Sequence, residues 1–140
     1  MAGVHFSFDS FIPLIQLNIG MSDRIDENRA ESFTILYCDF TGQSQEVITS
    51  SLEQVLRTSD AIVTHNGHYF FLLPYTDKYG AITVRNMFEE FFASDIPALE
   101  VSYPVDGENA RQLLDEVQFN AAKSLDTDLN FLDPDKMNAR

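Results

Sequence analysis

The chain has 140 residues, 44% hydrophobic and 22% charged, a composition that leaves room for one folded domain and excludes an intrinsically disordered chain. Its 22 acidic and 9 basic residues give a net charge of −13, so we expect no nucleic-acid binding and no binding to anionic membranes. No apolar run approaches the roughly 20 residues of a membrane-spanning helix, and the opening residues (MAGVHFSFDSF) lack the basic and apolar regions of a secretory signal.

The N-terminal half of the chain predicts a helix, a buried strand and a second helix. The first ten residues show no clear period, but residues 11–24 carry apolar side chains at helical spacing, with Pro13 in the first turn. Residues 33–40 (FTILYCDF) are aromatic, β-branched and apolar on both faces, which indicates a strand in the middle of a covered sheet. A turn over 41–45 then leads into a helix over 47–57, with apolar steps of three and four.

The clearest local signal is a β-hairpin. The apolar runs 61–64 (AIVT) and 69–73 (YFFLL) flank the dipeptide Asn66-Gly67, and both residues tolerate the positive φ of a tight hairpin turn. Pro74 then ends the second strand, because proline cannot donate to a strand ladder.

The C-terminal half predicts a helix over 77–93, a strand over 99–103, a last helix over 109–125 and a polar tail over 126–140. Between the first and last helices the order is βαββαβ, which is the ferredoxin-like arrangement of four strands under two crossover helices. We therefore predict an α/β (α+β) fold: a ferredoxin-like βαββαβ core with an added N-terminal and a C-terminal helix, in one domain over 1–125.

That order of elements and several short motifs together resemble a GGDEF domain, the fold of diguanylate cyclases, over roughly 11–125. Arg24 followed by the strand 33–40 resembles the opening helix and metal-carrying strand of the family. The run 56–76 (LRTSDAIVTHNGHYFFLLPYT) resembles the segment from an Arg-x-x-Asp motif through the signature hairpin. The run 101–114 (VSYPVDGENARQLL) resembles the last strand, turn and helix.

The signature loop of this family is degenerate here, and reads Asn66, Gly67, His68, Tyr69, Phe70. The family uses glycines at this loop so that the backbone approaches the guanine nucleotide, and an acidic residue that holds metal. In this chain Asn66 replaces a glycine, and His68 and Tyr69 replace the acidic pair.

The metal-carrying strand is also incomplete, because Asp39 is its only surviving candidate ligand. The family further needs a lysine-bearing stretch after that strand, and only the short turn 41–45 stands there. Phosphoryl transfer depends on metal-neutralised and positioned phosphates. We therefore predict no catalytic residue, no metal site, no cofactor and no cyclase activity.

One motif survives in the resemblance, Arg57-Thr58-Ser59-Asp60, with five residues between Asp60 and Asn66. In the family an Arg-x-x-Asp at this distance forms an inhibitory site that binds cyclic dimeric GMP, and Arg85 would supply the second arginine. The alternative is structural, because arginine favours the last turn of a helix and aspartate favours turns.

Three further patterns have simple structural explanations. His65 and His68 are three residues apart and could suggest zinc, but a tight hairpin aims them poorly, and we expect two solvated turn histidines. Cys38 lies in an apolar run, so we expect a buried, inert thiol in a cytoplasmic protein. Residues 126–130 resemble the start of a calcium loop, but the later glycine and glutamate are missing.

Phenylalanines are too numerous on some elements for one buried face. Phe88, Phe91 and Phe92 crowd one helix, and Phe70 and Phe71 are adjacent on one strand, so we expect some exposed rings. Exposed aromatic patches mark partner surfaces, which favours a homodimer or a protein partner. The sequence thus predicts a non-catalytic GGDEF-like signalling domain that acts by protein–protein interaction or self-association. A receptor for cyclic dimeric GMP is the alternative.

Overall fold

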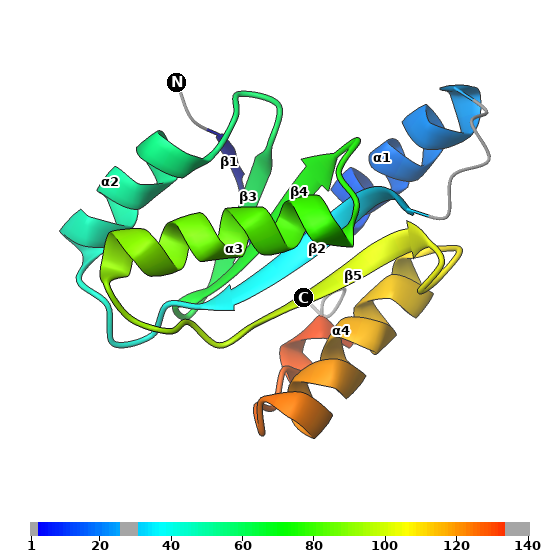
Figure 1. Cartoon of the computed structure of the whole chain (residues 1–140). Coiled ribbons are helices and arrows are strands. Elements are labelled where there is room, and N and C mark those ends of the chain that lie inside the picture. Colours follow the sequence, from blue (N-terminus) through cyan, green and yellow to red (C-terminus); the bar gives the residue numbers. More distant parts are fainter. Residues whose placement is uncertain (1–2, 26–30, 134–140) are drawn as a thin grey trace.

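The computed structural model describes residues 3–25 and 31–133 and shows a mixed α+β fold (Figure 1). Four α-helices, five strands and two short 3₁₀ helices occur in these ranges. In chain order they are β1 (Val4–Phe6), η1 (Phe8–Ser10), α1 (Phe11–Ile25), β2 (Glu31–Asp39), α2 (Gln45–Val55), β3 (Ala61–His65), β4 (His68–Pro74), α3 (Lys78–Phe92), β5 (Ala98–Pro104), α4 (Ala110–Ser124) and η2 (Asn130–Leu132).

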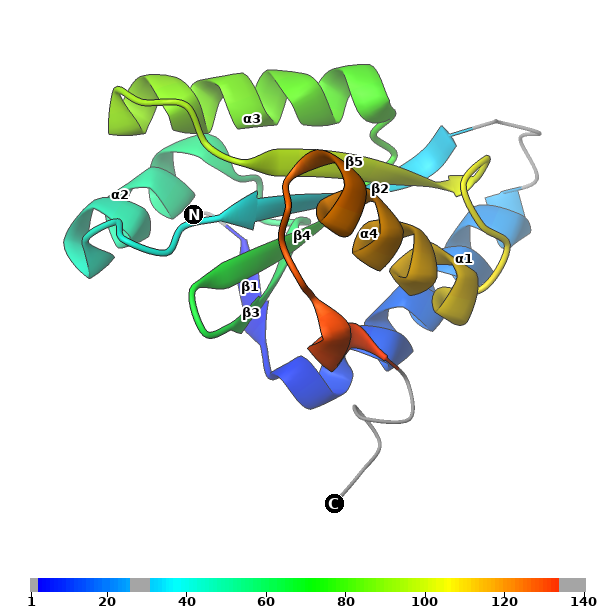
Figure 2. The same ribbon diagram turned by 90° about the horizontal axis from the view of Figure 1, so that it is seen from below.

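The five strands form one sheet in the order β1-β3-β4-β2-β5. β1 pairs with β3 in parallel, and the three other pairs are antiparallel. Helices α2 and α3 cover one face of the sheet, and α1 and α4 cover the other, as the view from below shows (Figure 2). The predicted α/β class is therefore confirmed at the level of a mixed sheet with helices on both faces.

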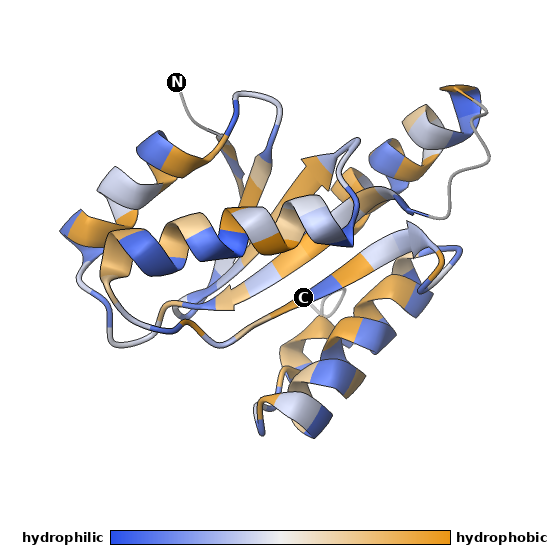
Figure 3. Cartoon of the chain, in the orientation of Figure 1, coloured by the Kyte–Doolittle hydropathy of each residue, from blue (hydrophilic) through white to orange (hydrophobic). Residues whose placement is uncertain are grey.

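β2 lies inside the sheet, between β4 and β5, and is apolar on both faces, as the sequence predicted. Phe33, Ile35 and Tyr37 enter the core beneath α1 and α4, while Leu36 and Cys38 enter the core beneath α2 and α3. All five side chains are buried. The middle of the sheet is accordingly hydrophobic between two layers of helices whose outer faces are mixed (Figure 3).

The predicted hairpin is confirmed at its turn. Asn66 has φ 50° and Gly67 has φ 84°, and both values lie in the left-handed region that a type I′ turn requires. His65 pairs with His68 across the turn. The predicted helices also form, with Ser44, Asp77 and Asn109 as N-caps of α2, α3 and α4.

The N-terminal strand β1 was not predicted. Three residues are too few to show a period, and β1 exists because it adds to the edge of β3 with Val4 opposite Ala61. Helix α3 leaves part of its aromatic set exposed, as the sequence predicted. Phe88 is fully buried, whereas Phe91 is 39% exposed, and Phe92 lies between these extremes.

The packed part of the chain extends beyond Leu125. Leu129 and Leu132 are buried in the core beneath α1 and α4, and Phe131 packs against the same core. The apolar residues between 129 and 132 thus anchor the first part of the segment predicted as a polar tail, and residues 134–140 of that tail lie outside the described ranges.

Candidate functional site

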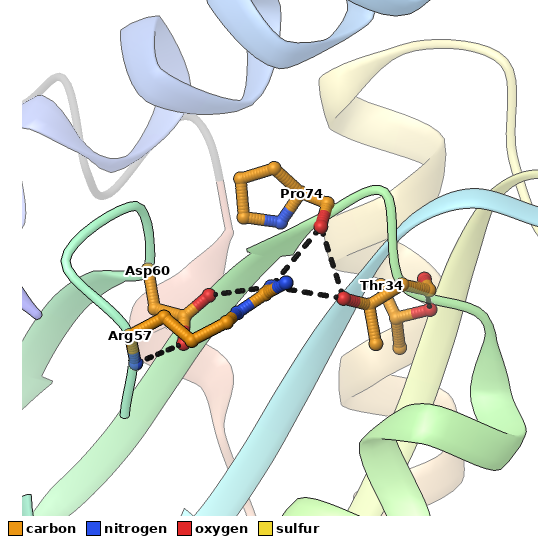
Figure 4. A network of polar contacts seen from close by, with 5 residues as sticks. Thr34, Arg57, Asp60 and Pro74 are labelled. Atoms are coloured by element: carbon orange, nitrogen blue, oxygen red, sulfur yellow. Dashed lines mark hydrogen bonds and ion pairs between the residues drawn. The ribbon is translucent and has the colours of Figure 1, made fainter. Parts of the chain in front are cut away.

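The Arg57–Asp60 turn lies between the end of α2 and the start of β3. The Asp60 carboxylate is buried, with 2% of its side chain exposed, and it accepts hydrogen bonds from the Arg57 backbone N–H (2.8 Å) and from Arg57 Nη2 (2.9 Å). The two residues of the predicted site are therefore brought together, but as an ion pair with each other (Figure 4). The pair closes the turn and neutralises a buried charge.

The Arg57 guanidinium also connects this turn to the end of β4. Nη2 donates to the Pro74 carbonyl and to Thr76 Oγ1, each at 3.1 Å. Thr34 of β2 in turn donates its hydroxyl to the Thr76 carbonyl at 2.7 Å, and its oxygen lies 2.7 Å from Ser102 Oγ of β5. Since the Thr34 proton is already used, Ser102 donates to Thr34.

These contacts form a chain of polar groups that runs across one end of the sheet from the Arg57–Asp60 turn to β5. Figure 4 shows the part of this chain from Asp60 to Thr34. The sequence analysis missed Thr34 and Ser102, which are both fully buried. A polar residue within an apolar strand is a weak sequence signal, and only the pairing of β2 with β5 at Thr34 and Ser102 brings the two hydroxyls together.

The same turn also holds β1. The Gly3 N–H donates to the Arg57 carbonyl and the Val4 N–H donates to the Asp60 carbonyl, each at 2.9 Å. Arg85, the predicted second arginine, instead donates from Nη1 to Glu100 of β5 at 3.1 Å, and no contact described for it involves the Arg57–Asp60 pair. The contacts thus favour a structural role for the motif, and the cyclic dimeric GMP site stays a prediction.

The degenerate signature loop lies at the opposite end of the sheet, beside Asp39. Asp39 pairs with His68 in register, and its carboxylate accepts hydrogen bonds from the backbone N–H (2.9 Å) and hydroxyl of Thr41. Tyr69 and Phe70 of the loop are buried in the two cores. Among the described residues no group of three histidine, cysteine or acidic side chains is placed to hold a metal ion.

His68 is held by the hydroxyl of Tyr37, which lies 2.6 Å from its Nδ1. Burial raises the pKa of Tyr37, and the nearby Asp39 charge raises it further. Burial also lowers the pKa of His68, so the neutral imidazole is favoured. The tyrosine O–H therefore donates, and the unprotonated Nδ1 accepts.

The two hairpin histidines are not the solvated turn residues that the sequence predicted. The His65 ring stacks on Phe131 with 4.2 Å between centroids, and it also lies 4.6 Å from the Phe8 ring. The Phe131 ring lies 5.6 Å from the His68 ring. The expectation was wrong because it treated residues beyond Leu125 as a solvated tail, so it left out the aromatic ring that covers both histidines.

We expect the lowered pKa of His68 to make folding stability depend on pH. Burial lowers the folded pKa below the ordinary value of 6.5, so the unfolded chain binds more protons between those two values. The free energy of unfolding should therefore fall as the pH drops from about 7 through 6.5 towards the folded pKa. Urea denaturation of His68→Gln at several pH values should show a weaker fall than the wild type.

His5→Gln is the control, because His5 is exposed on β1. An equally steep loss of stability in His68→Gln and in the wild type would contradict the assignment of this pH dependence to His68.

Cys38 is fully buried and unpaired, as predicted. Burial raises the pKa of its thiol, and the nearby Glu100 carboxylate raises it further. A thiol that is buried and protonated is a poor nucleophile, so Cys38 acts as a small apolar residue of the core beneath α2 and α3.

Two comparisons with known proteins found no match: no family model matches the chain, and no curated protein matches it. In the ranges 3–25 and 31–133 no helix has the length and apolar character needed to cross a bilayer.

Proposed function

We propose that this chain is a non-catalytic, GGDEF-like signalling domain that acts by binding another protein or a second copy of itself. The order of the strands supports the ferredoxin-like core of this proposal. Within β3-β4-β2-β5 all neighbours are antiparallel, and α2 and α3 make the two crossovers on one face. A cytoplasmic location belongs to the same proposal, because a free, buried cysteine suits a reducing compartment.

The absence of catalysis is supported by the contacts of the loop residues. Oδ1 of Asp39 accepts two hydrogen bonds from Thr41, one from its backbone N–H and one from its hydroxyl. His68 bonds to Tyr37, and Tyr69 packs into the core beneath α2 and α3. His68 and Tyr69 serve the fold and carry no carboxylate. Asp39 is then the single acidic group among these side chains, which is fewer than metal-assisted phosphoryl transfer needs.

Incubation with GTP and magnesium or manganese is therefore expected to give no cyclic dinucleotide above a control without protein. The assay should use chromatography of the nucleotides after long incubation. Turnover that disappears in the Asp39→Ala variant would contradict a non-catalytic role.

The observation that carries the binding role is an apolar stripe on the outer face of α1. Leu17, Met21 and Ile25 follow one another at four-residue spacing, and between 40% and 58% of each side chain is exposed. Gly20 lies beside them with open space around it. Exposed apolar groups that are gathered on one helix face mark partner surfaces more often than isolated ones do.

A second exposed set lies on α3, where Tyr79, Met87 and Phe91 are separated by multiples of four residues. Self-association is the form of binding that can be tested with the purified chain alone. Sedimentation equilibrium over a range of concentrations should show a species heavier than the 15.9 kDa chain. A constant monomer mass would leave only a different protein as the partner.

A further inference from the structure

The two edges of the sheet differ in how they are protected against pairing with another strand. The β5 edge has Pro97 before it and Pro104 at its end, and Glu100 at its centre is tied to Arg85. Prolines and charged side chains are the usual means by which a sheet edge avoids a second strand. β1 at the other edge reads Val-His-Phe, without proline, acidic residue, lysine or arginine, and its register with β3 is regular.

The register of β1 determines which backbone groups face outwards. Val4 pairs with Ala61, and its N–H donates to the Asp60 carbonyl, so the backbone polar groups of Val4 point towards β3. Backbone polar groups of successive residues in a strand point to opposite sides. The N–H and C=O of His5 therefore point away from the sheet, where a further strand would lie.

The side chains of β1 lie on two sides of the strand. Val4 and Phe6 share one side of the strand, and both are among the exposed large apolar residues. His5 lies on the other side, where it lines a groove of about 560 Å³ together with polar residues of α2, including Gln45 and Thr49. The groove leaves the strand accessible beside α2.

We propose that β1 pairs in antiparallel fashion with β1 of a second copy of this chain, about a twofold axis at His5. The two His5 residues would exchange their N–H and C=O groups in two hydrogen bonds. Val4 of each copy would then lie opposite Phe6 of the other copy, so both exposed apolar pairs would be covered. This proposal rests on the self-association in the proposed function and places that contact at β1, so that the α1 stripe is left to a different protein partner.

Charge and self-complementarity favour a second copy as the occupant. The chain carries a net charge of −13, but β1 itself has no acidic residue, so repulsion between two copies at this edge comes from flanking groups such as Glu53 of the groove. A short strand with two new hydrogen bonds makes a weak dimer, with a Kd of about 0.1–1 mM. Raising sodium chloride from about 50 to about 500 mM should tighten the dimer, because salt screens the remaining repulsion.

The test compares two lysine substitutions at exposed apolar sites. Val4→Lys places a charge on the β1 edge, and Leu17→Lys places the same charge on the α1 stripe. Sedimentation equilibrium at concentrations up to about 1 mM, above the Kd expected here, should show that Val4→Lys is monomeric and that Leu17→Lys dimerises like the wild type. In the wild type, hydrogen exchange at the His5 amide should slow as the concentration rises.

His5→Pro is a second variant for the case in which Val4→Lys disturbs folding. Proline removes the outward N–H and fixes φ near about −65°, and it is tolerated at sheet edges. A dimer that survives Val4→Lys and His5→Pro but is lost in Leu17→Lys would overturn the β1 pairing and leave the proposed function in place. A wild-type monomer at both salt concentrations would overturn the β1 pairing and self-association together. Circular dichroism would confirm that each variant is folded.

Discussion

Replacing Asp60 with alanine is expected to lower the free energy of unfolding by about 2–4 kcal/mol. The carboxylate is almost fully buried and accepts hydrogen bonds from the backbone and the guanidinium of Arg57. Without it, the arginine loses the partner that positions it towards Pro74 and Thr76. The loss of stability should extend to β1, because the backbone carbonyls of the same turn accept the hydrogen bonds that hold β1.

Arg57→Ala should cost less, about 1–2 kcal/mol, because 55% of the arginine side chain is exposed and water replaces part of its contacts. It still leaves the Asp60 carboxylate with fewer donors, so the effect exceeds the few tenths of a kcal/mol expected for an ordinary exposed arginine. Urea denaturation measures both variants. Asp95→Ala, at an exposed aspartate after α3, is the matched control and should change stability little.

This experiment also separates the two interpretations of the Arg-x-x-Asp motif. A structural role predicts a loss of stability in both variants and no heat when cyclic dimeric GMP is titrated into the wild type. Unchanged unfolding midpoints together with micromolar binding that Arg57→Ala removes would contradict the structural role and support the ligand site.

Gly67→Val is expected to lower the free energy of unfolding by about 2–4 kcal/mol. Gly67 has φ +84°, where a β-branched side chain is strained. A Cβ at this position would lie 2.7 Å from Cγ2 of Thr41, and the Gly67 carbonyl accepts a hydrogen bond from the Phe40 N–H. Backbone strain and close packing therefore add at the hairpin turn, and urea denaturation measures their sum.

Gly42→Val is the matched control, because Gly42 has nearly the same φ, +85°, but nothing lies within 4 Å of a Cβ built there. Gly42→Val should lower the free energy of unfolding only by the cost of the strained backbone conformation, about 1–2 kcal/mol. Thr41→Ser should recover part of the loss in Gly67→Val, since serine removes Cγ2 but keeps the hydroxyl that donates to Asp39. Equal losses at Gly42 and Gly67, with no recovery by Thr41→Ser, would show that the turn does not pack against Thr41.

The helices, the central strand and the hairpin could be predicted from the sequence because their signals are local. Residues 33–40 are apolar on both faces wherever the strand lies, and Asn66-Gly67 carries its turn preference in its own backbone. The GGDEF resemblance assigned metal ligands both to the strand with Asp39 and to the signature loop, and the register of β2 with β4 places Asp39 opposite His68 of that loop.

The candidate site depended on contacts between residues far apart in the chain. Arg57 and Asp60 are three positions apart in the sequence, and Pro74 lies beside them because β3 and β4 pair as a hairpin. Thr34 and Ser102 join this group only because β2 lies between β4 and β5. No local period or propensity encodes such a neighbour, because pairing between strands is decided by the burial of the whole sheet.

The surfaces were likewise decided by tertiary packing. The apolar spacing of α3 could not distinguish the buried Phe88 from the exposed Phe91, because the width of the buried stripe depends on how the helix rests on the sheet. β1 forms by addition to an edge that the rest of the fold provides, and Phe131 covers His65 only because Leu129 and Leu132 anchor its segment in the core. Local sequence therefore determined the four helices, the strand β2 and the β3–β4 hairpin, and the burial of apolar area across the whole chain determined which side chains meet and which stay exposed.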